Sequence, residues 1–293
     1  MKCHVVVVNW NGHEDTDQCL ESFCRHHNFD AVITVIDNSE NHAPLQLLEA
    51  KYPDIKFVYN QTNIGFAAAC NQAMTFSWAL DCDIVHFLNN DTIVISPYVD
   101  DSIRLFNECN NVVAISPCVN YFHDSGKSWF CNSSVNELTG EVIHIQTKPT
   151  QSIYLVPWLS GCSLLVRTCV FEELNGFDES LFMYCEDVDF SFRCKSAGYD
   201  LAMTSTVGLL HKVSASAEKV SMKSLFYDVR NKLIICRRYF CSVHGCAPFL
   251  RTVVREFARA LSRTIPISIR IQGGWVVTKS VISAICFPMR PQV

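Results

Sequence analysis

The sequence predicts an α/β protein with a mostly parallel central sheet flanked by helices. Two observations carry this prediction. Short apolar runs rich in Val and Ile alternate with helical patterns over the first half of the chain, as in parallel sheets covered on both faces. Polar residues follow directly after several of these runs, as at the ligand-binding edge of such a sheet. The chain has 293 residues, 49% hydrophobic and 18% charged, so it can bury a full core.

Five strands and four helices are expected in the first half. The strands are Val5–Val8, Val32–Ile36, Ile55–Tyr59, Ile84–Leu88 and Val112–Ile115. The helices lie near 14–27, 43–51, 65–80 and 97–109. Pro97 directly after Ser96 suits a helix start, with serine as the cap and proline in the first turn.

The second half is less regular. Residues 116–150 are rich in Gly, Asn, Ser and Lys with scattered aromatics, which predicts loops and a small hairpin over the functional face. Beyond them we expect strands at 160–166 and 199–207, a short helix that ends at Leu174, and helices at 187–197 and 219–240. After Gly245, four arginines recur every fourth residue and so share one helical face: Arg251, Arg255, Arg259 and Arg263.

Composition excludes several classes of protein. The net charge of −5 argues against a nucleic-acid binder, which needs a basic excess to offset phosphates. Sixteen cysteines are scattered without a Cys-x-x-Cys pair, and the apolar stretch after Met1 is too short for a secretory leader. We therefore expect reduced, mostly buried thiols in a cytoplasmic protein. The most apolar stretch, 265–287, is interrupted by charged residues, so no membrane span is expected.

Polar residues end the first two predicted strands. Asn9 and Asn11 follow the first strand and Asp37 follows the second, so all three belong at the carboxyl edge of a parallel sheet. There Asp37 could accept hydrogen bonds from a nucleobase or a ribose hydroxyl. The alternative is that it caps a turn with Asn38 and Ser39.

The segment from Asn63 to Asn71 opens a helix with Gly65 and several alanines. Small residues let the backbone approach a ligand, and a helix N-terminus attracts phosphate. The alternative is close packing of helix on sheet. Neither a Gly-x-Gly-x-x-Gly fingerprint nor a Walker-type Gly-Lys-Ser/Thr is present.

Asn89 and Asp91 stand two residues apart at the end of the fourth strand. They can point at one metal ion while Asn90 faces away. Mg²⁺ takes few protein ligands and fills its shell with phosphate and water, so two side chains suffice for a diphosphate substrate. The alternative is an Asx turn.

Carboxylates gather at 186–189, at a predicted helix N-terminus, where the helix dipole favours ionised groups. Asp187 facing a cleft would suit a general base, whereas Asp189 fits plain helix charge better. His211 follows an apolar strand and is either a metal ligand or structural.

Taken together, these motifs resemble glycosyltransferase family 2, and most of all its rhamnosyltransferase-like branch, which builds bacterial surface polysaccharides such as O-antigen and capsule. The resemblance runs from about residue 3 to about 240. Its motifs are Val6–Gly12, Ile36–Ser39, Asn63–Ala67, Leu88–Asp91, Ser160–Cys162, Gly176–Glu179, Glu186–Asp189 and His211.

The resemblance implies a nucleotide-diphospho-sugar transferase fold of the GT-A type and an inverting transfer. It implies a transferase domain over 1–240, with a nucleotide-binding half at 1–95 and an acceptor-binding half at 96–240. Residues 241–293 form a helical extension. Arginines along this extension could meet anionic lipid headgroups, or they could belong to a solvated helix at the domain edge.

Family roles carry over residue by residue. Asp37 matches the aspartate that reads the base, Asp91 the dependable metal ligand and Asp187 the catalytic base. His211 matches a histidine near the diphosphate and metal. The donor contacts implied are Asn9, Asn11, Asn63, Gly65, Asn71, Asn89, Asn90 and Arg230, the last near the donor phosphates. The acceptor contacts implied are Trp158, Gly161 and Glu186.

Two departures from the family pattern affect the metal site. Asn89 stands where the Asp-x-Asp motif begins with Asp, and no glycines follow His211. The metal is expected to be Mg²⁺ or Mn²⁺.

The partners implied are a nucleotide-sugar donor, with dTDP-rhamnose favoured over UDP-sugars, and a glycan or lipid-linked oligosaccharide at the inner membrane face. A sugar-nucleotidyltransferase would need a basic, Gly-rich loop after the first strand, which is absent. A non-catalytic nucleotide-sugar-binding protein would be expected to lack Asp91 or Asp187. The oligomeric state stays open.

Overall fold

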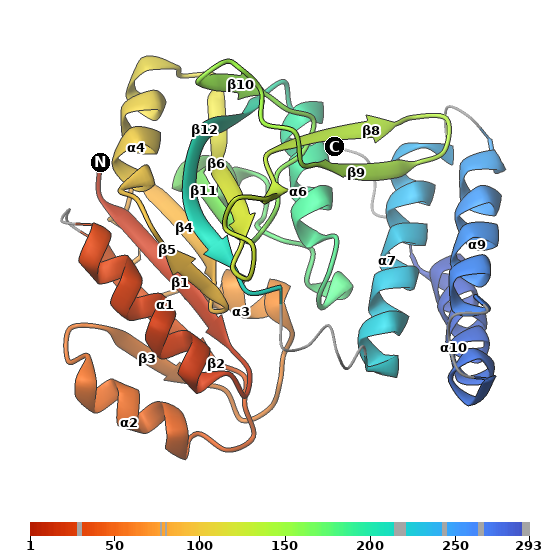
Figure 1. Cartoon of the computed structure of the whole chain (residues 1–293), viewed down its shortest axis with the longest axis horizontal. Coiled ribbons are helices and arrows are strands. Elements are labelled where there is room, and N and C mark those ends of the chain that lie inside the picture. The colour runs from red at the N-terminus through yellow and green to blue at the C-terminus, as the bar shows by residue number, and fades with distance from the viewer. Residues whose placement is uncertain are drawn as a thin grey trace.

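The structure is a computed structural model that describes residues 1–27, 31–76, 78–79, 81–213, 221–241, 245–262 and 267–288. A large sheet lies between layers of helices, and a separate helical group stands beside it (Figure 1). The expected α/β class is confirmed, with a mostly parallel central sheet and a C-terminal helical extension.

Four parallel strands make up the first half of the sheet, in the order β3-β2-β1-β4. They are β1 (Cys3–Asn9), β2 (Ala31–Asp37), β3 (Lys56–Tyr59) and β4 (Ile84–Asn89). The connecting helices are α1 (His13–His26), α2 (Ala43–Lys51) and α3 (Phe66–Ala73). β1 and β4 are buried along almost their whole length because both of their faces are covered, which explains their continuous apolar runs.

The second half of the sheet is mixed. β11 (Ser163–Arg167) runs antiparallel to both β4 and β6 (Val112–Tyr121), and β12 (Asp200–His211) lies parallel to β6. Shorter strands complete the sheet: β5 (Thr92–Val94), β7 (Ser128–Phe130) and β10 (Ile153–Leu155). The helices of this half are α4 (Tyr98–Glu108), α5 (Thr168–Glu173), α6 (Glu186–Ser196) and a short 3-10 turn, Glu179–Leu181.

Several predicted boundaries need correction. β12 continues to His211 instead of ending at 207, because the polar residues near 205 form an irregularity inside the strand and it then pairs with β5. α3 ends at Ala73 instead of near 80. The residues that follow it form tighter turns with hydrogen bonds between residues three apart, and the Trp78 indole donates a hydrogen bond to Thr34 (3.0 Å). At α4 the cap is Pro97 and not Ser96.

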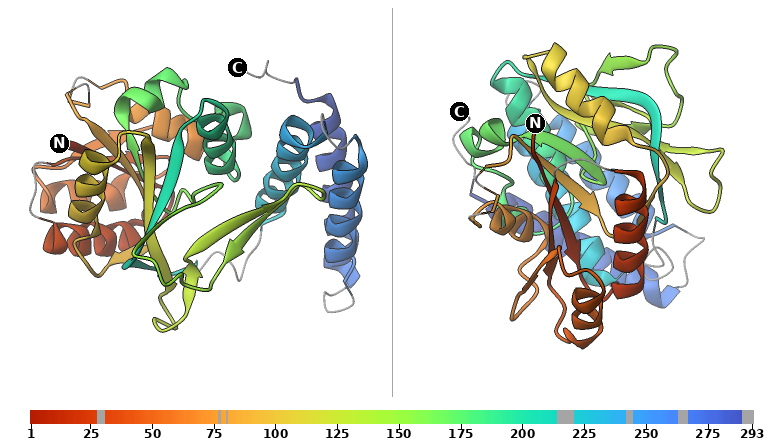
Figure 2. Two further views of the ribbon diagram at one scale, coloured as in Figure 1. Left: turned by 90° about the horizontal axis from the view of Figure 1, so that it is seen from above. Right: turned by 90° about the vertical axis from the view of Figure 1, so that its left-hand side faces the viewer.

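The predicted hairpin in 116–150 is present. It consists of β8 (Asn132–Asn136) and β9 (Glu141–Ile145), which pair with each other and extend away from the main sheet. Figure 2 shows the hairpin reaching toward the helical group. There Glu141 forms an ion pair with Arg255 (3.0 Å) of α9 (Ala247–Ala260).

The helical group consists of α7 (Met222–Tyr239), α9 and α10 (Ile267–Cys286), which pack on one another. Its core includes Val229, Leu233, Ala260 and Val277. Within the described residues, no helix is long and apolar enough to cross a membrane. Arg263, the last of the four periodic arginines, lies outside the described residues.

The expectation that all thiols are reduced is wrong at one place. Cys118 on β6 and Cys131, between β7 and β8, form a disulfide. Both are fully buried, so the fold brings them together although 13 residues separate them. The other cysteines of the described residues are free, and about half of them are buried.

Candidate active site

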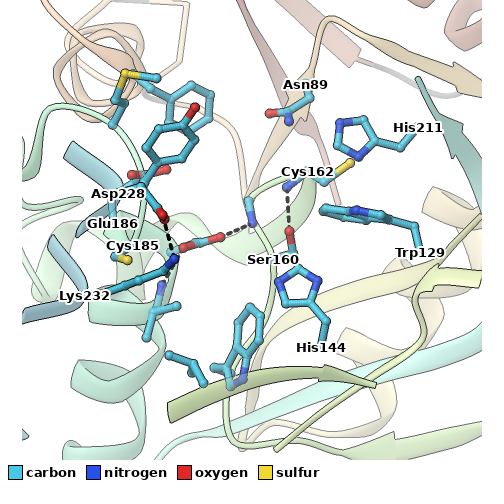
Figure 3. Close-up of a pocket in the computed structure, with 18 residues that line it drawn as sticks. Asn89, Trp129, His144, Ser160, Cys162, Cys185, Glu186, His211, Asp228 and Lys232 are labelled. Atoms are coloured by element: carbon cyan, nitrogen blue, oxygen red, sulfur yellow. Dashed lines mark hydrogen bonds and ion pairs between the residues drawn. The ribbon is translucent and has the colours of Figure 1, made fainter. Parts of the chain in front are cut away.

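A cavity of about 520 Å³ opens at the carboxyl edge of the parallel strands (Figure 3). Asn89 reaches it from the end of β4 and His211 from the end of β12. β11 runs antiparallel, so the residues that precede it, 160–162, arrive at the same edge. The remaining walls come from the loop and first turn of α6, from α7 and from the β7–β9 segment. The carboxyl edge is where parallel sheets bind ligands.

At one end of the cavity, His211 contacts Asp91, which lies behind it and does not itself line the cavity. His211 Nε2 lies 3.1 Å from Asp91 Oδ1, and Asn89 stands at the same end in Figure 3. Burial lowers the pKa of His211, but contacts with Cys162 and Asp91 outweigh this effect and raise it to about 10. The same contact with His211 helps to hold the pKa of Asp91 below its usual value, against the opposing effect of burial.

These side chains fit a partial site for a hard cation. The Asp91 carboxylate and the Asn89 amide oxygen, ligand types preferred by Mg²⁺ and Mn²⁺, lie at this end beside the His211 imidazole. Because the pKa of His211 is raised to about 10, the imidazole would become a ligand only after losing a proton. Within the described residues, no group of three or more His, Cys, Asp and Glu side chains could hold a metal ion. A cation here would therefore depend on oxygens from a bound diphosphate and from water.

Asn90 faces away from this end, as predicted. Its side-chain amide donates to Thr16 Oγ1 (3.1 Å) and, more weakly, to the Gly12 carbonyl (3.4 Å). These hydrogen bonds connect the turn at residues 89–91 to the start of α1.

At the centre of the cavity, Asp187 occupies the first turn of α6. Its Oδ2 accepts a hydrogen bond from the Gly161 N–H (2.8 Å), and its Oδ1 accepts one from the Val188 N–H (2.8 Å). Burial raises the pKa of Asp187, while these two backbone donors lower it. The carboxylate is thus held in a fixed direction at the point where β11 and α6 meet.

The neighbouring carboxyl group has a different environment. Glu186 is buried and lines the same cavity, and among the described residues its Oε2 has no hydrogen-bond partner. Burial, with the adjacent charge of Asp187, raises its pKa to about 8. Burial thus favours the protonated form of both neighbouring carboxyl groups, and the two backbone donors oppose this effect at Asp187. Two carboxyl groups whose environments push their pKa values apart are a frequent acid–base arrangement.

Asp189 has a structural role and not a catalytic one. It is buried and forms ion pairs with Arg193 (2.9 Å) and Arg238 (2.7 Å). Arg238 also binds Asp178 (2.6 Å), so this network joins α6 to α7.

Three of the residues predicted to bind the nucleotide, Asn9, Asn11 and Asp37, lie together at the ends of β1 and β2, outside the cavity lining. Asp37 is fully buried, and its Oδ1 accepts hydrogen bonds from Asn9 Nδ2 (2.8 Å) and Ser39 Oγ (2.6 Å). Its Oδ2 lies 2.7 Å from His42 Nδ1. The turn-capping contact with Ser39 is thus present, and both Asp37 oxygens already have protein partners. Asn11 is exposed beside this cluster.

The segment at the start of α3 packs closely on the loop that precedes α6. Gly65 has φ +91°, and a Cβ on it would lie 2.6 Å from the Phe182 carbonyl oxygen, so only glycine fits. Asn63 accepts a hydrogen bond from the Gly65 N–H (2.9 Å). Asn71 binds both the N–H and the carbonyl of Phe177 (2.9 Å each).

Arg230 also contacts this loop and does not line the cavity. Its guanidinium donates to the Ser180 carbonyl (3.1 Å) and to Asn231 Oδ1 (2.9 Å), and it lies over the ring of Phe287.

Among the cavity-lining side chains that sequence reasoning missed, four are polar or aromatic groups on the β7–β9 segment and on α7. Trp129 and His144 come from the β7–β9 segment, and their rings pack at 5.1 Å, with Trp129 also 4.4 Å from His211. Asp228 and Lys232, one turn apart on α7, form an ion pair (2.6 Å) on the other side, as Figure 3 shows. The only feature of the sequence that could have indicated these two residues is their spacing of four, which places them on one face of a helix. Trp158 lines the cavity too, but it is buried and anchors β8 by donating to the Ser134 carbonyl (3.2 Å).

Comparison with known families places this cavity in context. Residues 2–233 match the family described as "Glycosyltransferase like family 2". The chain belongs to this family. The match covers the whole sheet and ends within α7, so that every residue lining the cavity is inside it.

Relatives of this family 2 protein include rhamnosyltransferases, which confirms the resemblance seen in the sequence. Rhamnosyltransferase WbbL of Escherichia coli K12 is 34% identical over 102 residues, covering 31% of this chain and 39% of that relative. The N-acetylglucosaminyl-diphospho-decaprenol L-rhamnosyltransferase of Mycobacterium tuberculosis is 23% identical over 235 residues, covering 71% and 75% of the two chains.

Solved structures confirm the GT-A type of fold. GalNAc-T7 with UDP, GalNAc and Mn²⁺ matches with a TM-score of 0.63 at 14% identity, over 100% of this chain and 59% of that one. Staphylococcus aureus TarS 1–349 in complex with UDP-GlcNAc matches with a TM-score of 0.62 at 16% identity, over 97% and 82%. At such identities the likeness establishes the fold alone.

Proposed function

We propose that this protein is an inverting glycosyltransferase that moves a sugar from a nucleotide-diphosphate donor to a hydroxyl group of a glycan or lipid-linked oligosaccharide. The observation that carries the proposal is the placement of Asp187. It is an oriented carboxylate in the same cavity as Asn89 and His211, on a fold shared with nucleotide-sugar enzymes.

In this proposal Asp187 is the general base. It takes the proton from the acceptor hydroxyl, whose oxygen attacks the anomeric carbon from the face opposite the nucleoside diphosphate. One displacement inverts the anomeric configuration. The N–H groups of Gly161 and Val188 keep the carboxylate aimed, while Glu186, when protonated, can donate a hydrogen bond to the acceptor.

The donor end is assigned to Asn89, Asp91 and His211, which would hold Mg²⁺ or Mn²⁺. When bound, such a cation offsets the negative charge that grows on the departing diphosphate. The nucleotide is assigned to the half of the chain at 1–95, beside Asp37. Two of the relatives are named rhamnosyltransferases, which favours dTDP-rhamnose. A UDP-sugar is the second candidate, because TarS was solved with UDP-GlcNAc.

The acceptor end is assigned to the aromatic and polar walls around Asp187. Trp129 and His144 present ring surfaces to the cavity, and Trp158 lies behind them. Aromatic rings suit the apolar faces of a pyranose, and the Asp228–Lys232 pair across the cavity offers polar contacts to its hydroxyls. The non-catalytic alternative is disfavoured, since a binding protein has no need of an oriented, ionised Asp187.

The C-terminal extension is assigned to peripheral contact with the inner face of a membrane. Residues 245–293 carry seven basic residues and one acidic residue, a net charge of +6, which leaves −11 for residues 1–244. Val254 on α9 and Trp275 on α10 are apolar and more than 60% exposed. Basic amphipathic helices of this kind bind anionic headgroups. Co-sedimentation with anionic vesicles, and none with neutral vesicles, is the expected result; equal recovery from both would contradict it.

Thermal stabilisation by dTDP, UDP and GDP, each with and without Mn²⁺, tests the donor proposal. We expect one nucleotide to raise the melting temperature only when the metal is present. A ligand at 100 times its dissociation constant stabilises by about 2.7 kcal/mol, which is a shift of about 4–5 °C for a chain of this size. No shift with any of the three would count against a donor site.

A further inference from the structure

The loop that leads into the proposed base has an unusual backbone. Three non-glycine residues between 180 and 185 have positive φ: Phe182 (67°), Tyr184 (68°) and Cys185 (65°). Phe182, with ψ −60°, is the centre of a γ-turn closed by a hydrogen bond from the Met183 N–H to the Leu181 carbonyl (2.8 Å). This turn is the rare, strained form. Residues in such conformations persist only where their surroundings enforce them.

The surroundings that enforce this loop lie on α7. Asn231 is fully buried, and its Nδ2 lies 2.8 Å from each of three loop carbonyl oxygens, those of Leu181, Met183 and Tyr184. Arg230 binds the Ser180 carbonyl and orients Asn231 by donating to its Oδ1 (2.9 Å). Four of the five carbonyls from 180 to 184 are thus bound by two adjacent side chains.

The remaining carbonyl, that of Phe182, points away from α7 and toward α3. Phe182 O accepts hydrogen bonds from the Phe66 N–H (2.7 Å) and the Ala67 N–H (3.3 Å) at the start of α3. The loop is therefore held between α7 on one side and the Gly65 segment on the other. Directly after it come Glu186 and Asp187, so the path of the loop sets where the Asp187 carboxylate enters the cavity.

We propose that Asn231 is a positioning residue for catalysis: its side-chain amide holds the strained 180–185 loop in the one conformation that aims Asp187 at the acceptor. This role rests on the proposed function of Asp187. Arg230, which was expected near the donor phosphates, instead supports Asn231 in this role. Asn is required because its amide both donates to the loop carbonyls and accepts from Arg230.

The test compares two substitutions on the same helix. Asn231→Ala removes the donors to the loop. Arg237→Ala is the matched control, because the Arg237 guanidinium also binds three carbonyls, those of Ala284, Ile285 and Phe287, but at the far end of α10. The assay is release of nucleoside diphosphate from the nucleotide sugar whose nucleotide stabilises the wild type, with water as acceptor. Rates are measured well below the melting temperature of each variant.

We expect Asn231→Ala to lower kcat about 100-fold, the scale of a misplacement of about 1 Å, with the donor KM and the nucleotide-dependent thermal shift changed less than threefold. Arg237→Ala should lose melting temperature but keep kcat within threefold. Asn231→Ser, which retains one O–H donor, should lie between Asn231→Ala and wild type, and it serves if the alanine variant does not fold.

Two results would overturn the inference. One is a wild-type kcat in Asn231→Ala and Asn231→Ser. The other is an equal loss of kcat in Arg237→Ala at a similar melting temperature, which would mean that Asn231 supports only the fold. Failure of the proposed function itself looks different, because the wild type would then release no nucleoside diphosphate and show no nucleotide-dependent shift.

Discussion

Asp187→Asn should lower the rate of transfer by about 10²–10⁴-fold, the usual contribution of a general base, while the affinity for the donor nucleotide stays within a few-fold. The amide has the shape of the carboxylate but cannot take a proton. Both Asp187 oxygens accept backbone N–H groups, so the new NH₂ must face either Gly161 or Val188. The variant should therefore also melt at a lower temperature, and rates and melting curves need to be measured together.

Asp228→Asn is the comparison for this experiment. Asp228 is a second cavity carboxylate, but Lys232 binds it at 2.6 Å and keeps it from acting as a base, so its loss should cost less than tenfold. The wild-type pH profile gives an independent readout. Asp187 must be ionised to act, and burial raises its pKa, so activity should fall on acidification at a pH above the usual aspartate value of about 3.9. Retained turnover in Asp187→Asn would remove Asp187 from the role of base.

Asp91→Ala should abolish the part of nucleotide binding that depends on metal. We expect the affinity for the nucleotide in the presence of Mn²⁺ to fall at least about tenfold, because even residues that merely support metal ligands contribute that much. Binding without Mn²⁺ should change little. Titration of the nucleotide with and without Mn²⁺ measures both quantities.

The control for this substitution is Asp200→Ala. Asp200 begins the strand that His211 ends, and it is bound by Lys195 and Asn111 at the opposite edge of the sheet. Its loss removes a carboxylate from the same strand without touching the cavity. If both variants keep the same response to Mn²⁺, the cation is not held at Asp91.

The sheet was largely predictable because its strands are buried on both faces. Continuous runs such as Val5–Val8 and Ile84–Leu88 have one physical explanation, and the structure contains both strands. The end of β12 was not predictable. Polar residues near 205 look like the end of a strand, and only pairing with β5 and β6 carries the strand on to His211.

The positions of site residues were predictable where those residues follow a buried strand. Asn89 and Asp91, at the end of β4, lie at the carboxyl edge of the sheet. Trp129, His144 and Lys232 were missed because they reach the cavity from a hairpin and a helix with no motif of their own. Arg230 was assigned to the donor phosphates through the family resemblance alone, and in the structure it donates to the Ser180 carbonyl, 50 residues away.

The hydrogen bonds from Arg230 and Asn231 to the 180–185 loop also have a consequence for folding during synthesis. Asn231 follows the carbonyls that it binds by 47 to 50 residues. At about 5–20 residues per second, the ribosome needs about 3–10 s to add that length. A nascent chain can therefore complete its sheet while the loop before Asp187 still lacks its partner. The path of the loop before Asp187 is therefore set only after α7 has emerged and docked.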